Sequence, residues 1–230
     1  MRRIILTVIC IYSISCSIFA GDISTFVNLG FSGDSRYFMF GQYGLKESSS
    51  APYSDLFIVD VPLNKFPKYG DKTLSYKKQV EPGNNGLGAL LNIAEQNIAL
   101  KTEYKIDHLL NGRILYHYIN GDKVNKPIKF RDFNTGKRYE LTLHQSKEGK
   151  GKKIKSSFYI DFTIINSKGK SKKIIVGHST FKRNGIRKYR IKQIILAPDT
   201  KSYVFVIEKE ELDTVGINIR YMVETIKINF

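Results

Sequence analysis

The carboxylates of this chain are its most obvious candidates for chemistry. Asp34, Asp55 and Glu224 stand in or beside short apolar runs, and two carboxyl groups gathered in a cleft suffice for acid–base hydrolysis. A carboxylate-dependent hydrolase is therefore one expected function. The sequence contains no G-x-S-x-G, H-E-x-x-H or P-loop motif to support it, so we assign no catalytic residue.

The histidines show no pattern of metal ligation. His108, His117, His144 and His178 are scattered along the chain without the short spacings that structural or catalytic metal sites use. We therefore predict no metal site and no cofactor.

Four residues are candidates for ligand contact instead. Tyr43 and Tyr53 lie near the first predicted hairpin and are expected to form an aromatic surface there, unless they pack over a hydrophobic edge. Arg220 and Glu224 are four residues apart on a predicted strand, so they share one face. This spacing predicts either a structural ion pair or an arginine that binds an anion.

Asp34 and Asp199 stand at equivalent places of an internal repeat. Residues 31–40 match residues 196–205 without a gap, and each aspartate lies between two apolar segments. Asp side chains in such turns accept hydrogen bonds from nearby backbone N–H groups. We expect a structural role for both.

The elements that position these residues are mostly strands. Short apolar runs rich in β-branched and aromatic residues are separated by turn signals such as Asn184-Gly185, which predicts repeated hairpins and a mainly antiparallel β fold. One stretch differs, because apolar residues recur every three or four positions over 87–101 and predict a helix. A sandwich and a partial β-propeller both fit this pattern.

The first 20 residues have the order of a secretory signal. Arg2 and Arg3 precede an apolar run that ends in small residues at Ala20, and this predicts a signal peptide over 1–20 and a single secreted β-rich domain over 21–230. Both cysteines, Cys10 and Cys16, fall in this leader. Acylation of Cys16 is the alternative to cleavage after Ala20, and it would tether the domain to a membrane.

The charge of the chain favours anionic partners. Without Arg2 and Arg3, 35 of the 37 basic residues remain against 21 acidic ones, a net charge of about +14. The run 147–155 (KEGKGKKIK) is expected to form a solvated hairpin tip or an anion-contacting finger. Export makes nucleic acid an unsuitable partner and an envelope protein or an anionic envelope polymer a suitable one. Membrane contact is expected only if the leader is retained or Cys16 is acylated.

Three segments resemble a known family. Residues 31–44, 55–61 and 216–225 are similar to predicted secreted bacterial proteins of the domain of unknown function 2259 family. That resemblance implies secretion but no activity. At both ends of the mature chain, the strand, Asp-containing turn and strand also resemble the blade repeat of TolB-type β-propellers.

Together these features predict an exported protein of the periplasm or outer envelope. We expect a non-catalytic binding or scaffold module that uses loops and a basic face. A secreted hydrolase and a lipid-tethered surface adhesin are the alternatives.

Overall fold

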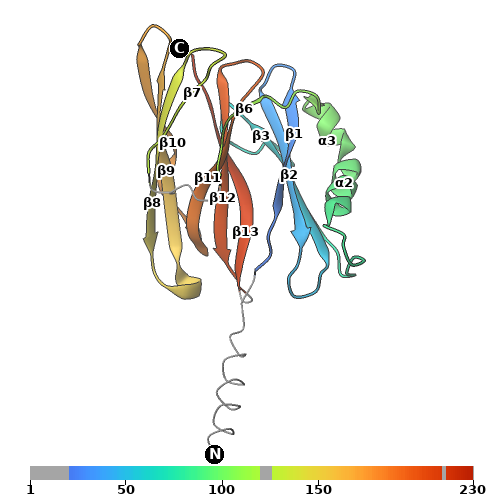
Figure 1. Cartoon of the computed structure of the whole chain (residues 1–230). Helices are drawn as coiled ribbons and strands as arrows, with labels where there is room; N and C mark the ends of the chain where they lie inside the picture. Colours follow the sequence, from blue (N-terminus) through green and yellow to red (C-terminus); the bar gives the residue numbers. More distant parts are fainter. Residues whose placement is uncertain (1–20, 120–125, 214–215, 230) are drawn as a thin grey trace, which may run out of the picture.

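Three antiparallel sheets stack face to face in a computed structural model that describes residues 21–119, 126–213 and 216–229 (Figure 1). The central sheet has the strand order β13-β12-β11-β6, the outer sheet β10-β9-β8-β7, and the helix-side sheet β4-β3-β2-β1-β5. The predicted leader, with Cys16, lies outside the described residues, so its cleavage or acylation stays a prediction.

The strands have the following bounds. The central sheet contains β6 (Arg113–His117), β11 (Ile186–Leu196), β12 (Ser202–Leu212) and β13 (Ile217–Lys227). The outer sheet contains β7 (Ile128–Arg131), β8 (Arg138–Glu148), β9 (Lys155–Ile165) and β10 (Ser171–Asn184). The helix-side sheet contains β1 (Thr25–Ser32), β2 (Tyr37–Leu45), β3 (Pro52–Asp60), β4 (Asp71–Ser75) and β5 (Ile106–Asp107).

Strand β12 shows why the central sheet lies in the middle. Successive side chains of a strand point to opposite faces. Phe205 and Ile207 pack into the core shared with the outer sheet, and Val204 and Val206 pack into the core shared with the helix-side sheet. All four side chains are fully buried. A strand that is apolar on both faces is stable only between two layers.

Two helices cover the far face of the helix-side sheet (Figure 1). Helix α2 (Leu87–Gln96) and helix α3 (Ile98–Glu103) meet at Asn97. The single helix expected over 87–101 is therefore interrupted. The Asn97 side chain donates to the carbonyl of Ile93 over 2.8 Å, and an amide that bonds to nearby backbone competes with the helical pattern.

The architecture is the sandwich alternative, extended to three sheets. The sheets lie in parallel layers rather than as blades around an axis (Figure 1), so the TolB-type likeness is confined to two hairpins. The repeated segments, residues 31–40 and 196–205, lie in the β1–β2 and β11–β12 hairpins, which pack against each other through a shared core.

The two turn aspartates lie in the corresponding hairpins. Asp34 accepts the N–H of Arg36 over 3.0 Å, and Asp199 accepts the N–H of Ser202 over 2.8 Å. The N–H of Asp199 also donates to the hydroxyl of Ser35 over 3.1 Å. The two turns thus join the helix-side sheet to the central sheet.

An ion pair joins the outer sheet to the central sheet. Arg113 on β6 forms two hydrogen bonds, of 2.8 and 2.7 Å, to the buried carboxylate of Asp132, which follows β7. The Arg113 guanidinium holds the pKa of Asp132 at about 2, below its usual 3.8. The ionised form is therefore favoured by folding.

We expect Asp132→Asn to remove about 1–2 kcal/mol of folding free energy at neutral pH, after allowance for the partly exposed partner. Because the pKa of Asp132 is depressed in the folded state, this stability is present above the unfolded pKa of about 4. It is lost as the pH falls towards 2. Urea unfolding at several pH values measures the difference.

The matched control is Asp71→Asn, at an exposed position of β4. It should follow the wild-type pH profile. A constant difference between wild type and Asp132→Asn from neutral pH down to pH 2 would contradict the assignment.

Candidate functional site

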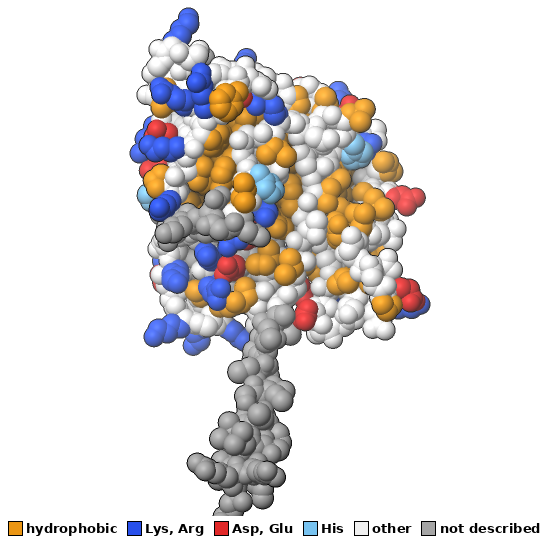
Figure 2. All heavy atoms as spheres, in the orientation of Figure 1, with side chains coloured by type: hydrophobic (Ala, Val, Ile, Leu, Met, Phe, Trp, Pro, Cys, Tyr) orange, Lys and Arg blue, Asp and Glu red, His pale blue; other side chains and the backbone are white. Residues whose placement is uncertain are grey.

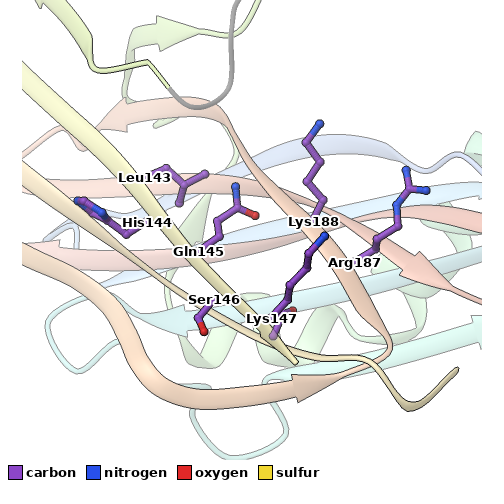
Figure 3. A pocket seen from close by; sticks show the side chains of 8 residues that line it. Leu143, His144, Gln145, Ser146, Lys147, Arg187 and Lys188 are labelled. Carbon is purple, nitrogen blue, oxygen red and sulfur yellow. The ribbon is translucent and has the colours of Figure 1, made fainter. Parts of the chain in front are cut away.

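A basic pocket opens at one end of the gap between the outer and central sheets (Figure 3). Its volume is about 680 Å³, within the range of small-molecule sites. We call it the basic pocket; its lining residues are Leu143, His144, Gln145, Ser146, Lys147, Ser156, Arg187 and Lys188. None of them is a carboxylate.

The alternation of β8 creates the pocket. Leu141 and Leu143 point inward and pack against the core, so Gln145 and Lys147 continue the same face of the strand. Because these two side chains are polar, the apolar packing between the outer and central sheets ends there. The side-chain carbonyl of Gln145 accepts the N–H of Tyr189 over 2.7 Å and so links β8 to β11 beside the opening.

The charge of the pocket is positive. Arg187 is paired with Glu210, with its Nη2 2.7 Å from Oε2. Lys147 and Lys188 have no ion-pair partner among the described residues. Figure 3 shows the side chains of Lys147, Arg187 and Lys188 gathered at one end of the pocket.

More lysines surround this opening. The end of the β8–β9 hairpin, residues 148–155, which we call the basic tip, exposes four of them: Lys150, Lys152, Lys153 and Lys155. Its one carboxylate, Glu148, is 2.6 Å from the Nζ of Lys182, and that lysine lowers the pKa of Glu148. Figure 2 shows Lys and Arg side chains around the lower left end of the molecule, where this hairpin lies.

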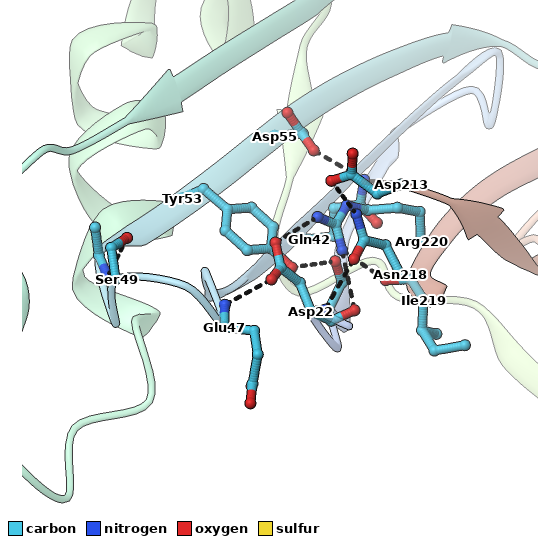
Figure 4. Close-up of polar contacts among 12 residues, drawn as sticks. Asp22, Gln42, Glu47, Ser49, Tyr53, Asp55, Asp213, Asn218, Ile219 and Arg220 are labelled. Atoms are coloured by element: carbon cyan, nitrogen blue, oxygen red, sulfur yellow. Dashed lines mark hydrogen bonds and ion pairs between the residues drawn. The ribbon is translucent and has the colours of Figure 1, made fainter. Parts of the chain in front are cut away.

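Arg220 and Tyr53 lie in a different place, the N-terminal clamp (Figure 4). The guanidinium of Arg220 lies 4.4 Å from the centre of the Tyr53 ring, and its Nη2 is 3.1 Å from the carboxylate of Asp22. The Tyr53 hydroxyl is 2.9 Å from that of Ser24. Burial raises the pKa of Tyr53. These contacts bind Asp22 to strand β13 and Ser24 to strand β3.

Backbone hydrogen bonds complete the clamp. Ile219 donates to the carbonyl of Asp22 over 2.8 Å, and Ser24 donates to the carbonyl of Ile219 over 3.1 Å. Ile23 therefore pairs in parallel with the edge strand β13. The first described residues of the chain extend the central sheet.

Neither tyrosine of the expected aromatic surface is open to solvent. Tyr43 is buried with Leu90 of helix α2 in the helix-side core, and Tyr53 is buried under Arg220. Both rings therefore serve packing in this structure.

Arg220 and Glu224 do not pair with each other. Glu224 instead accepts hydrogen bonds from Arg183 over 3.1 Å and from Asn64 over 2.5 Å, and it lies in a second, apolar groove.

The three carboxylates of the hydrolase alternative have separate partners. Asp34 is bound in its turn by Ser32 and Arg36. Asp55 accepts from Gln42 and Thr73, and only Glu224 lines the apolar groove. Among the described residues, no cluster of three or more His, Cys, Asp or Glu is suited to a metal ion.

The sequence identified only part of this site. The run 147–155 marked the basic tip, but Arg187 and Lys188 carried no motif, and Gln145 is unremarkable in sequence. The alternation of β8 from leucine to polar residues on one face was the available signal.

The comparisons with known proteins agree with the resemblance noted above. A family model described as "Predicted secreted protein (DUF2259)" matches residues 39–227. The first turn, with Asp34, precedes the matched range. No curated protein matches the chain. None of the helices in the described part of the chain is long and apolar enough to span a membrane.

The clamp predicts a local effect of Arg220→Gln. The amides of Ser24 and Ile219 should exchange with solvent about tenfold faster, because the loss of the Asp22 contact removes ~1.4 kcal/mol from local stability. Hydrogen exchange followed by NMR measures both amides. Lys129→Gln, which breaks the exposed ion pair with Glu140, is the control. Unchanged exchange at both amides of Arg220→Gln would refute the clamp.

Proposed function

Since this chain belongs to the DUF2259 family of predicted secreted proteins, we propose that it is a non-catalytic binding module of the periplasm or outer envelope. Its ligand is an anionic envelope polymer, which it binds with the basic pocket and the basic tip. The observation that carries this proposal is a pocket lined by three basic side chains and no carboxylate.

The electrostatics of the site support an anionic ligand. Lys147 and Lys188 project into the pocket without an ion-pair partner in the described structure. Like charges held together repel each other, and a phosphate or carboxylate group relieves that repulsion. Ser146 and Gln145 add polar atoms that can contact the oxygens of such a group.

The layout of the lysines favours a polymer over a protein. The basic tip continues from the pocket, so successive anionic groups of one chain can meet the pocket and then the exposed lysines. Lysine is depleted at the core of protein–protein interfaces, where aromatic and apolar anchors dominate. The basic tip has no such anchor, since its one apolar residue, Ile154, is buried.

The alternatives stay predictions. The hydrolase requires two carboxylates to meet, whereas Asp34, Asp55 and Glu224 have separate partners. The surface adhesin depends on acylation of Cys16, outside the described residues.

The proposal predicts salt-dependent binding of polyanions. Wild-type protein should bind poly(glycerol phosphate) and polyglutamate at low salt, bind them more weakly at high salt because exposed charges are screened, and not bind uncharged dextran. The double variant Lys147→Gln/Lys188→Gln should lose about tenfold in affinity, or ~1.4 kcal/mol. Isothermal titration calorimetry gives these affinities.

The control is Lys168→Gln/Lys170→Gln, which removes the same charge from the exposed β9–β10 turn. It should bind polyanions almost as the wild type does. Equal losses of polyanion affinity in the two double variants would show that only the net charge matters. That result would overturn the proposed site. Binding to an envelope protein alone, with no affinity for either polyanion, would overturn the choice of ligand.

A further inference from the structure

A second site lies where the edge of the central sheet crosses the helix-side sheet. It is an apolar groove of about 760 Å³, which we call the aromatic groove. Its lining includes residues 221–224 of strand β13, the rings of Phe40, Phe57 and Phe66, and Phe181 and Arg183 of β10. It shares no lining residue with the basic pocket.

Three of the lining rings form a stacked ladder. Phe40 and Phe57 are stacked with centroids 4.9 Å apart, and Phe57 and Phe66 with centroids 5.6 Å apart. Phe40 is buried, whereas 54% of Phe66 is exposed. The ladder therefore leads from the core to solvent, and its outer ring, Phe66, offers exposed apolar surface.

A bulge in β10 contains Phe181, which lines the groove. The pairing with β9 shifts between His178 and Arg183, so the intervening residues leave the ladder. Phe181 is 59% exposed there. The Arg183 guanidinium lies 4.8 Å from the Phe181 ring and 5.2 Å from the Phe158 ring, which positions both side chains above the groove.

The carboxylate in the groove is already neutralised. Glu224 has a side-chain exposure of 4% and is paired with Arg183, and its other oxygen accepts from Asn64. Besides Tyr221, the remaining ionisable groups of the lining are Lys65, His178 and Lys209, of which Lys209 pairs with Glu211. Lys65 is exposed and without an ion-pair partner in the described structure. The charge that no ion pair in the groove neutralises is therefore positive.

The edge of β13 is closed to an added peptide strand. The amide of Tyr221 donates to the Gln42 side chain over 2.8 Å, and the amide of Thr225 donates to the Asn64 side chain over 2.8 Å. Side chains that occupy the edge in this way prevent strand pairing. The groove is open to a ligand that needs apolar contact and few backbone hydrogen bonds.

We propose that the aromatic groove binds a single-chain anionic amphiphile, with its acyl chain on the phenylalanine ladder and its head group at Lys65. The chain replaces water over Phe57, Phe66 and Phe181, and apolar burial drives such binding. Lys65 selects the anionic head. This inference does not depend on the ligand of the basic pocket.

Calorimetry with sodium dodecanoate and dodecyltrimethylammonium, both below their micelle concentrations, tests the proposal. Wild-type protein should bind the anion at least tenfold more tightly than the cation of the same chain length. Phe66→Ala and Phe181→Ala should each weaken dodecanoate binding about tenfold. Lys65→Gln should weaken the binding of dodecanoate but not the binding of the cation. Since the three residues are exposed and lie outside the core, the variants should remain folded.

The control is Phe133→Ala, at a ring that is 88% exposed beyond β7, and it should bind dodecanoate as the wild type does. The proposal fails if dodecanoate does not bind, if the cation binds equally well, or if Phe133→Ala matches Phe66→Ala. A further arm uses vesicles of anionic phospholipid. Binding to vesicles without binding to dodecanoate would identify a membrane surface as the ligand and overturn the groove.

Discussion

The burial of one sheet on both faces is the constraint on which this structure depends. Strand β12 places Phe205 and Ile207 in one core and Val204 and Val206 in the other. Such a strand needs an apolar layer on each side, which the outer and helix-side sheets provide. The helix-side sheet is apolar on its second face as well, so helices α2 and α3 must cover it.

The margins of this stack position both proposed sites. Where the inward face of β8 changes from leucine to Gln145 and Lys147, the outer and central sheets separate and the basic pocket opens. Where β13 ends the central sheet, the phenylalanines of the helix-side sheet continue beyond it and form the aromatic groove. Each site uses surface that the stacked layers leave uncovered.

The sequence predicted the class of fold more accurately than it predicted which side chains contact each other. Alternating apolar strands and Asn-Gly turns predicted antiparallel β structure, but layer order depends on which faces meet. Arg220 and Glu224 show the limit. Residues four apart on a strand are separated by about 13 Å, so each takes a partner from another element: Asp22 for Arg220, and Arg183 for Glu224. The break at Asn97 depends on the hydrogen bond from its side chain to the Ile93 carbonyl. The periodicity of apolar residues contains no information about that bond.

The most direct test of the central claim is to map amide chemical shifts during titration with a short poly(glycerol phosphate) oligomer. The structure predicts changes confined to residues 143–156 and 186–188, at the basic pocket and the basic tip. The aromatic groove should show none. Changes spread evenly over the lysines, or centred on the groove, would contradict the proposal that this end of the sheet stack is the polymer-binding site.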